Sequence, residues 1–542
     1  MANNNNKSKN NHILIIGGGT AGWLSAAILA KSLHSKREDG VKVTLIESPD
    51  IPILGVGEGT WPNLRATLHR IGISETDFIR ECDVTFKQGA EFINWAKTPE
   101  HSQKQSPSSN LNSNPNSSSS YYHPLSTVNH SSYNFNLAPY WLQQDKKTRL
   151  PYDRAVASQA RLCDQGIAPK QIVMPQYSAA QEYAYHLNAN KFSSFLKRHC
   201  IENLGVTFVS ANVTKVQLDD DEFIEYVVTD HSSIKKINAD FFIDCSGSKG
   251  LIIKETYNIP WHDISDIIFN DTALAVQVPY QDKTQAIKTH TLATAQDAGW
   301  IWDIGLQTRR GVGHVYSSKY TTEQKAKQQL IDYLGDDYNS ELMIRKIKLN
   351  HGYHKKFWHK NSVAIGMSAG FIEPLEASAI FLFDAAANML ATQFPRDKAQ
   401  MLYAEGKFNQ QLTLRMERTV EFIKLHYCIS ERRDSQYWID NCDPVSIPQH
   451  LQERLSFWKS QPPTKYDFDN AWEPFNLDSY LYVLYGMGFD TDVSEVASKY
   501  TDVIKAEKLF TEIDQASDLM IKKLPKHREL IKKVIQYGFS QV

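Results

Sequence analysis

A glycine-rich turn near the N-terminus constrains this chain more than any other feature. Residues 12–16 form a short apolar run that predicts a buried strand, and residues 21–33 are rich in Ala and Leu and predict a helix. Between them stands a G-x-G-x-x-G motif, whose glycines permit a tight turn, let a pyrophosphate approach the backbone and pack helix against strand. The helix N-terminus presents its positive dipole end to the phosphates. The motif predicts a dinucleotide site built from Gly17, Gly19, Thr20, Ala21 and Gly22.

Three later segments extend this site. Glu47 follows a second predicted strand, 25 residues after Gly22, where an acidic side chain would bind ribose hydroxyls. The strand–helix–strand order predicts a parallel sheet. The motif alone fits either NAD or FAD. Two more strand-to-turn segments, 242–248 and 363–371 with Gly366, favour FAD, because a compact NAD domain would keep such turns within ~150 residues.

Composition limits the partners and the compartment. The 542 residues include 59 Lys and Arg against 61 Asp and Glu, so no basic field exists to hold nucleic acid or anionic lipid. Six cysteines without C-x-x-C spacing indicate neither a disulfide framework nor a metal site. No apolar run approaches the ~20 residues of a membrane span, and residues 1–11 lack the apolar core of a signal peptide. We expect a cytoplasmic protein with a disordered leader over 1–11, no metal and no membrane partner.

The chain predicts an α/β fold: a Rossmann-like FAD-binding domain with mixed β-sheets over 12–435, and a mainly α-helical C-terminal subdomain over 436–542 on the substrate side. A Ser/Asn-rich insertion at about 98–132 cannot bury enough apolar surface to offset its ordering entropy. We expect it to be mobile; ordering by a partner or substrate is the alternative. Among other elements, the pattern predicts helices at 74–89, 180–199, 376–392 and 408–426 and a strand at 300–306.

A series of motifs in order resembles the flavin-dependent halogenase family, the tryptophan halogenase group. The resemblance covers about residues 12–490 and rests on GGGTAGW (17–23), GVGEGTWP (55–62), Phe86-Lys87 with FINW (92–95), Tyr185-His186, DCSG (244–247), GWIWDIG (299–305), GFIEPLE (370–376) and LHY (425–427). It implies FAD in its reduced form FADH2, a separate flavin reductase, O2, a chloride or bromide ion and a small aromatic substrate. The family also suggests a homodimer, and it leaves open whether the arene is free or tethered to a carrier protein.

The resemblance also implies the roles of individual residues. Gly57, Glu58, Gly59 and Thr60 would form the strap that contacts the flavin. Lys87 would hold hypohalous acid beside the arene, either as an ammonium that polarises it or, with a pKa lowered by burial, as an amine that forms a haloamine. Glu376 would orient the oxidant with Lys87 or act as general base. Backbone amides of Ser378 and Ala379, at a predicted helix N-terminus, would bind the halide. Trp300 and Trp302 would lie beside a tunnel, although core packing alone also explains them.

Two departures from the family pattern put the substrate in doubt. The proline of the W-x-W-x-I-P signature is Gly305, and the E-S-T-G segment is Glu376-Ala377-Ser378-Ala379. We expect an electron-rich arene, of the indole, tryptophan or phenol type. The aromatic-rich C-terminal part would supply its walls, or would serve helix packing only. Two alternatives remain open: an FAD-dependent hydroxylase, and a flavin-binding protein whose catalytic pocket has degenerated.

Overall fold

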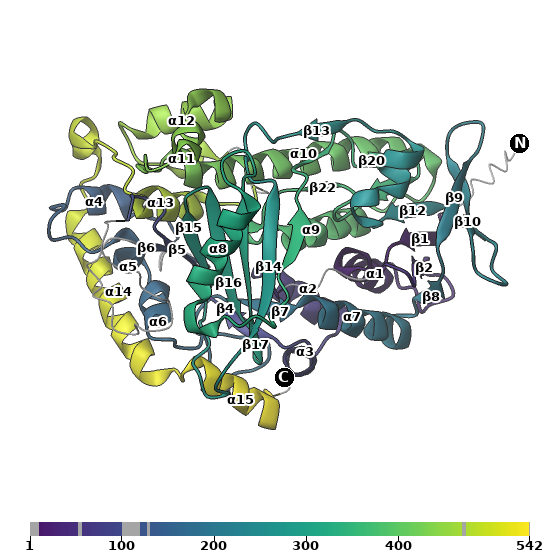
Figure 1. The fold of residues 1–542 in the computed structure, drawn as a ribbon, viewed down its shortest axis with the longest axis horizontal. Helices are drawn as coiled ribbons and strands as arrows, with labels where there is room; N and C mark the ends of the chain where they lie inside the picture. Colours follow the sequence, from purple (N-terminus) through teal and green to yellow (C-terminus); the bar gives the residue numbers. More distant parts are fainter. Residues whose placement is uncertain (1–9, 52–56, 100–119, 127–130, 469–472, 541–542) are drawn as a thin grey trace, which may run out of the picture.

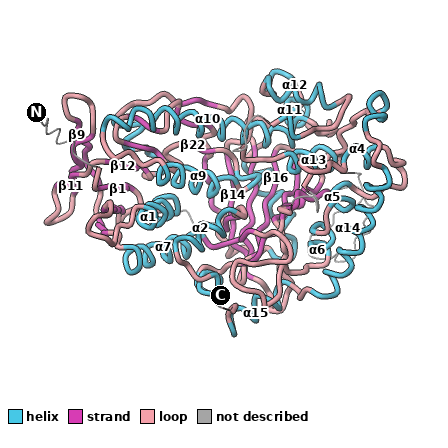
Figure 2. The backbone as a smooth tube through the Cα atoms, turned by 180° about the vertical axis from the view of Figure 1, so that it is seen from behind, coloured by secondary structure: helices cyan, strands magenta, loops and turns pink. Residues whose placement is uncertain are grey.

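A computed structural model describes residues 10–51, 57–99, 120–126, 131–468 and 473–540. The molecule has three regions along its longest axis (Figure 1). A parallel sheet with its helices lies at one end, a seven-stranded sheet lies in the middle, and helices close the opposite end. Figure 2 shows the same arrangement from behind. The predicted leader lies outside the described residues except at Asn10 and Asn11.

The predicted Rossmann-like sheet is present and has six strands. Its order is β20-β21-β12-β1-β2-β8, and every neighbouring pair is parallel except β20 and β21. Buried apolar strands bring the glycine turn after β1 next to the ends of β2 and β12. The strands are β1 His12–Ile16, β2 Lys42–Glu47, β8 Thr207–Ser210, β12 Phe241–Asp244, β20 Trp358–His359 and β21 Ser362–Ala364.

Three helices and a small sheet cover the two faces of this parallel sheet. On one face, the buried residues of α1 Thr20–Ser32 pack between α7 Ala189–Leu204 and α9 Ser378–Thr392. On the other face, the π-helical turn Leu251–Thr256 and an antiparallel sheet share an apolar cluster with Leu14 and Phe242. That sheet consists of β9 Val213–Leu218, β10 Ile224–Thr229 and β11 Lys236–Asn238. The resulting α/β/β layering covers both faces of the parallel sheet.

The seven-stranded sheet is mixed, as predicted for the sheets of this chain. Its order is β18-β14-β17-β16-β15-β5-β6, and only β15 and β5 run parallel. The strands are β5 Gly89–Ile93, β6 Ser120–Pro124, β14 Thr272–Pro279, β15 Thr291–Gln296, β16 Gly299–Gly305, β17 Arg309–Tyr316 and β18 Arg345–Lys348. Two smaller sheets connect it to the rest: β3 Gly57–Gly59, β7 Ala184–Asn188 and β4 Thr85–Lys87, and β13 Trp261–Asp263, β19 Gly352–His354 and β22 Gly370–Phe371.

Helices make up most of the remaining chain. They are α2 Asn63–Ile71, α3 Glu75–Glu81, α4 Ala138–Leu142, α5 Tyr152–Val156, α6 Gln159–Asp164, α8 Glu323–Leu334, α10 Lys398–Cys428, α11 Gln436–Asn441, α12 Gln449–Trp458, α13 Leu477–Gly486, α14 Val503–Lys523 and α15 His527–Tyr537. The last segment returns to the core, because α15 packs on α3 and His527 Nε2 accepts a hydrogen bond from the Phe86 amide at 3.0 Å. The C-terminal helices therefore support the strand that carries Lys87.

Five boundary predictions were wrong. The helix predicted over 408–426 begins ten residues earlier, at Lys398, where Asp397 caps it. The helix predicted over 74–89 ends at Glu81, and Lys87 lies on strand β4 because Thr85, Phe86 and Lys87 pair with β7 instead of continuing the helix. The helix predicted over 180–199 begins at 189, after β7, where the Asn188 side chain caps it. The helix predicted over 376–392 begins at Ser378, because Ala377 adopts φ +54° and separates it from a 3₁₀ turn.

The fifth correction concerns the Ser/Asn-rich insertion. Residues 100–119 and 127–130 lie outside the described residues, so the predicted mobility is not tested there. Residues 120–124, however, form strand β6 at the edge of the seven-stranded sheet, paired with β5. Tyr121 and Tyr122 are almost completely buried there. Aromatic side chains end the low-complexity composition at Tyr121, and they supply the apolar surface that the Ser/Asn-rich stretch lacks.

Candidate active site

A cavity of about 1060 Å³ opens at the carboxyl ends of the parallel strands β1, β2, β12 and β21. Ligands bind at this edge in open α/β sheets because loops and helix N-termini converge there. The cavity continues past the parallel sheet to β16 in the seven-stranded sheet. Most of the predicted cofactor residues line it, namely Gly17, Gly19, Thr20, Ala21, Glu47, Gly57, Glu58, Gly59 and Gly366. Gly22 and Thr60, which were also predicted, do not line it.

The glycine turn leaves its backbone open to the cavity. Gly17 has φ +118°, and a Cβ there would lie 2.1 Å from the Cys245 carbonyl oxygen. A Cβ on Gly22 would lie 1.9 Å from the Gly17 oxygen, so the third glycine lets helix and strand touch. Gly19 faces open space, with no atom within 4 Å of its would-be Cβ. A phosphate can therefore reach the backbone amides at the start of α1, which fits a dinucleotide.

Two acidic side chains lie at different parts of the same cavity. The Glu47 side chain, at the end of β2, lies against Gly18 and forms an ion pair with Lys197 at 2.8 Å. The carboxylate therefore stands at the strand end where a ribose would lie. Glu58 lies on β3, and burial raises the pKa of its carboxyl to about 7. At neutral pH this group can therefore act as a hydrogen-bond donor or an acceptor.

Lys87 lies at the inner end of the cavity, at the end of strand β4. Its side chain is 4% exposed, and its Nζ donates to the Thr60 carbonyl oxygen at 3.2 Å. Burial lowers the pKa of Lys87 to about 8, against the charge of Glu376, which raises it. Gly59 leaves room for this arrangement, because a Cβ there would come within 3.5 Å of Nζ and 3.2 Å of the Ala377 Cβ.

Glu376 is held between two histidines and does not itself line the cavity. His123 Nδ1 lies 3.0 Å from both carboxylate oxygens, and His426 Nε2 lies 2.9 Å from Oε1. Burial opposes ionisation, but the two imidazoles outweigh it and hold the pKa of Glu376 well below its usual range. The Glu376 carbonyl accepts from Trp61 Nε1 at 2.7 Å. Lys87 and Glu376 are therefore tied to consecutive residues, Thr60 and Trp61.

The proton arrangement follows from the partners of His426. Its Nδ1 faces the Phe422 carbonyl oxygen at 2.9 Å, and a carbonyl only accepts, so Nδ1 carries hydrogen. Its Nε2 lies 2.9 Å from Glu376 Oε1 and has no hydrogen-bond partner among the described residues.

The predicted halide residues lie where helix α9 begins. Ala377, Ser378 and Ala379 all line the cavity, and Ala377 holds a left-handed conformation that starts the helix. No side chain caps this N-terminus. Free amides and the helix dipole therefore point to the space near Lys87, which favours a small anion.

Trp300 and Trp302 lie on the same face of β16 and line the cavity. Their ring centroids are 6.3 Å apart, and both indoles are buried. Gly313 on the neighbouring strand makes room, because a Cβ there would lie 2.2 Å from the Trp302 ring. The strand alternation predicted from sequence is therefore confirmed, and it places two indoles in the cavity wall.

The sequence did not predict His123 or a role for His426. His123 fell within the predicted insertion, although the Tyr-Tyr-His-Pro run after the serines carries a strand pattern that could have separated it. His426 stood within a family motif but had no assigned partner. Both reach Glu376 from elements far apart in sequence, β6 and α10, which only the tertiary structure brings together.

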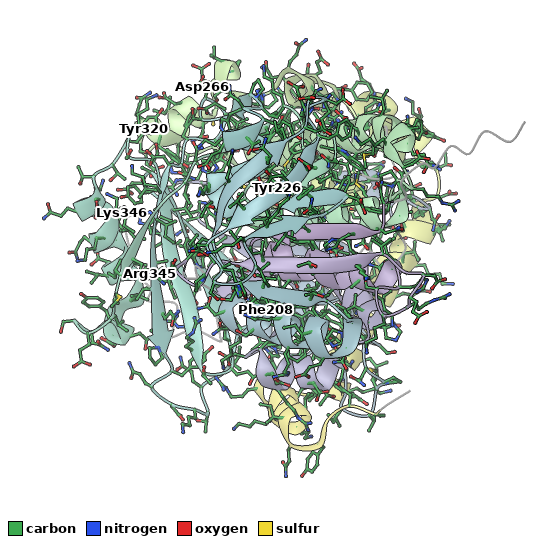
Figure 3. All side chains as sticks on the ribbon, turned by 90° about the vertical axis from the view of Figure 1, so that its right-hand side faces the viewer. Phe208, Tyr226, Asp266, Tyr320, Arg345 and Lys346 are labelled. Carbon is green, nitrogen blue, oxygen red and sulfur yellow. The ribbon has the colours of Figure 1, made fainter. Side chains whose placement is uncertain are left out.

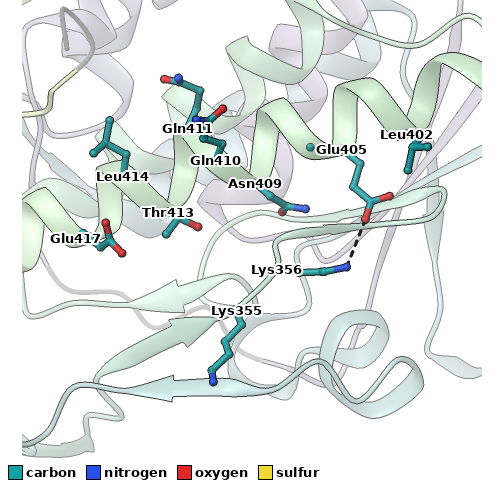
Figure 4. A pocket seen from close by; sticks show the side chains of 11 residues that line it. Lys355, Lys356, Leu402, Glu405, Asn409, Gln410, Gln411, Thr413, Leu414 and Glu417 are labelled. Carbon is teal, nitrogen blue, oxygen red and sulfur yellow. Dashed lines mark ion pairs between the residues drawn. The ribbon is translucent and has the colours of Figure 1, made fainter. Parts of the chain in front are cut away.

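An open hollow of about 630 Å³ lies elsewhere, between α10 and the Lys355–Lys356 segment (Figure 4). Lys356 and Glu405 face each other across it at 3.9 Å. It contains none of the predicted site residues. No group of three or more His, Cys, Asp or Glu side chains that could hold a metal ion occurs among the described residues.

Comparison with known proteins identifies the family. The profile described as tryptophan halogenase matches residues 12–502. The chain belongs to the tryptophan halogenase family. It is 31% identical to the tryptophan 7-halogenase RebH of Lentzea aerocolonigenes over 96% of this chain and 97% of that protein. The crystal structure of a tryptophan halogenase from Shewanella frigidimarina NCIMB 400 superimposes with a TM-score of 0.91 at 41% identity, over 99% of both chains. BrvH, a flavin-dependent halogenase from Brevundimonas sp. BAL3, superimposes with a TM-score of 0.82 at 28% identity, over 97% of this chain and 99% of that chain.

Family membership favours the halogenase interpretation over the hydroxylase and the degenerate flavoprotein. The protein is a flavin-dependent halogenase, with FADH2 as cofactor and O2 and a halide ion as co-substrates. Such enzymes generally need a separate flavin reductase and act on small aromatic substrates. No helix in the described part of the chain is long and apolar enough to cross a membrane.

Proposed function

We propose that this halogenase acts on an electron-rich arene of the indole class, and that Lys87 and Glu376 carry the chemistry at the arene. The observation that carries the proposal is a buried lysine and a histidine-held glutamate bonded to consecutive residues: Lys87 Nζ donates to the Thr60 carbonyl, and the Trp61 indole donates to the Glu376 carbonyl. Lys87 lines the cavity that fits the cofactor, and aromatic rings lie against the two histidines that hold Glu376.

Aromatic side chains surround Glu376 and its histidines. The Trp61 ring stacks on Phe381 at 4.4 Å and meets Phe475 edge-on at 4.7 Å. Phe422 lies 5.6 Å from the His123 ring and stacks on Phe475 at 3.7 Å. Flat π-faces and few charged side chains favour a planar arene by stacking and area burial. These contacts support an indole more than a substrate recognised through charge.

The cofactor would be held by the glycine turn, Glu47 and the β3 strap, and when bound it would supply the oxidation of halide to hypohalous acid. Free amides at Ser378 and Ala379 would hold the halide ion near Lys87. Lys87 Nζ would then hold the oxidant, by hydrogen bonding as an ammonium or by bonding to halogen as an amine. Its lowered pKa of about 8 makes both forms accessible near neutral pH.

Glu376 would take the proton that leaves the arene when halogen replaces hydrogen. The carboxylate is ionised, since its pKa is held low, and it can accept this proton. His123 donates from Nδ1 and keeps the carboxylate oriented. Trp300 and Trp302 would keep organic substrates away from the cofactor. A homodimer, a carrier-tethered arene and a cytoplasmic location remain proposals from the family and the sequence.

Incubating the protein with FAD, a flavin reductase, and chloride or bromide tests the proposal. Indole, tryptophan and phenols serve as free arenes, and mass spectrometry detects the halogenated products. We expect halide-dependent monohalogenation of at least one indole by the wild type. Lys87→Ala should bind FAD but form no product. Lys327→Ala, an exposed lysine on α8 outside the cavity, is the matched control and should remain active. Equal product without halide, or a Lys87→Ala enzyme near wild-type rates, contradicts the proposal.

A further inference from the structure

A continuous line of tryptophan and tyrosine side chains leads from the cavity wall to the surface. Trp302 and Trp300 line the cavity, and successive rings follow with no other residue type between them. The centroid distances along the line are 6.3, 6.3, 5.0, 6.2 and 5.6 Å, for Trp302, Trp300, Trp95, Tyr427, Tyr437 and Tyr320 in that order. We call these six residues the Trp/Tyr chain. All are buried except Tyr320, which is half-buried.

The outer end of the Trp/Tyr chain reaches solvent. Figure 3 shows Tyr320 at the periphery of the molecule. Its hydroxyl donates to Asp440 Oδ2 at 2.7 Å, and this hydrogen bond lowers the pKa of the Asp440 carboxyl. Asp440 is therefore ionised at neutral pH. The Asp440 carboxylate can therefore accept the phenolic proton when Tyr320 loses an electron.

The middle of the chain carries a second carboxylate. Tyr427 donates to Glu373 Oε1 at 2.5 Å, and Asn270 Nδ2 donates to Oε2 at 2.7 Å. The Tyr437 hydroxyl in turn donates to Asn270 Oδ1 at 3.0 Å, so one amide links the two phenols. Burial raises the pKa of Glu373 to about 7, so this group can take a proton and return it near neutrality. Packing alone does not require a buried carboxylate on a tyrosine.

A branch through Trp438 is less favourable, although its ring lies 5.6 Å from Trp95. The Arg432 guanidinium carbon stands 4.5 Å from the Trp438 ring centroid. A cation over the ring stabilises the neutral indole and opposes a positive charge on it. The Tyr427 hydroxyl instead donates to the Glu373 carboxylate, so these charges favour oxidation of Tyr427 over oxidation of Trp438.

From this geometry we propose that the Trp/Tyr chain conducts oxidising equivalents from the cofactor cavity to the surface, where a small reductant removes them. One electron leaves Trp302 for a one-electron oxidant in the cavity, of which photoexcited oxidised FAD is one class. Trp300 then gives an electron to Trp302, and Trp95 gives one to Trp300. Tyr427 then gives up an electron, and its phenolic proton moves to Glu373.

The remaining steps return every proton. Tyr437 passes an electron to the Tyr427 radical, while its proton moves to Asn270 Oδ1 and Asn270 Nδ2 gives a proton to the Tyr427 oxygen. Tyr320 then gives its electron to Tyr437, and the Tyr320 proton moves to Asp440. Glu373 returns its proton to Asn270 Nδ2, and Asn270 Oδ1 returns one to Tyr437, so the amide is restored. A reductant in solution restores Tyr320, and Asp440 returns the proton. The net change is one electron from the reductant to the oxidant, so the site is spared oxidative damage.

Flash illumination of the full-length protein loaded with oxidised FAD tests this path, with ferrocyanide as the external reductant. Transient absorption and electron paramagnetic resonance detect tryptophanyl and tyrosyl radicals. In the wild type we expect a tyrosyl radical that ferrocyanide quenches. Tyr427→Phe should lose the tyrosyl signal and leave the radical on tryptophan. Tyr320→Phe should keep a tyrosyl radical that ferrocyanide no longer quenches.

Two further variants provide a control and an independent test of the proton acceptor. Tyr152→Phe alters a buried tyrosine outside the chain and should match the wild type. Glu373→Gln preserves side-chain volume but removes the proton acceptor, and it should slow tyrosyl formation even if Tyr427→Phe binds FAD poorly. The proposal is overturned if the wild type with bound FAD gives no tyrosyl radical. It is equally overturned if Tyr427→Phe and Glu373→Gln match the Tyr152→Phe control.

Discussion

Replacing Lys87 by Met should stabilise the fold while it removes activity. Lys87 is buried, and the ion-paired partners of Glu376 are His123 and His426. Among the described residues the ammonium therefore has only the Thr60 carbonyl as a hydrogen-bond partner. The drop of the Lys87 pKa from 10.5 to about 8 corresponds to about 3 kcal/mol, at 1.36 kcal/mol per unit. Methionine has a similar length and no charge, so its burial avoids this cost.

The pH dependence of this gain has a definite sign. Between pH 8 and 10.5 the unfolded chain binds more protons at Lys87 than the folded protein does, so wild-type stability rises with pH in this window. Below pH 8 both states hold the proton and the cost is constant. Lys87→Met should therefore be more stable than wild type by up to about 3 kcal/mol at pH 7, and the difference should disappear above pH 10.5.

Lys170 provides the matched control, because it is a buried lysine with a direct partner. Its Nζ lies 3.0 Å from Glu75 Oε2, and both side chains are fully buried. Lys170→Met leaves the Glu75 carboxylate without its cation, which should cost about 3–5 kcal/mol. Urea unfolding at pH 7 and pH 10 measures both variants. A Lys87→Met protein that is less stable than wild type at pH 7 would refute the reasoning, because Lys87 would then be a stabilising charge.

Three other substitutions have defined outcomes. His123→Phe removes the Nδ1 donor from Glu376, so the pKa of Glu376 should rise; acid unfolding followed by circular dichroism should begin at a higher pH, and an unchanged onset would contradict this contribution. Ala379→Gly removes a methyl group at the proposed halide site, so the bromide-to-chloride product ratio should increase, at a helix cost of about 1 kcal/mol; an unchanged ratio in mixed-halide competition would place the halide elsewhere. Gly59→Ala puts a methyl group 3.2 Å from the Ala377 Cβ, so turnover at saturating FAD should fall; full turnover would show that the turn tolerates displacement.

Some features of the site followed from the sequence because they depend on local chemistry. The G-x-G-x-x-G turn needs only a strand before it and a helix after it, and both patterns are local. The alternation that puts Trp300 and Trp302 on one face is a property of any strand. Helical periodicity was less reliable around Lys87, because Thr85 and Phe86 fit a helix face and a strand equally until β7 pairs with them.

The sequence by itself determined the dinucleotide turn, the mixed α/β class and the ordered motifs of the family. The tertiary structure alone decided the environment of Glu376, because His123, Trp61 and His426 approach it from β6, the end of β3 and α10. Burial and charge depend on such distant neighbours, and together they lower the pKa values of both Lys87 and Glu376. The lower pKa favours the neutral form of Lys87 and the charged form of Glu376. The same long-range packing aligns the Trp/Tyr chain, whose members are spread from residue 95 to residue 437. A sequence lists these residue types, but only the folded chain fixes the distances at which they act.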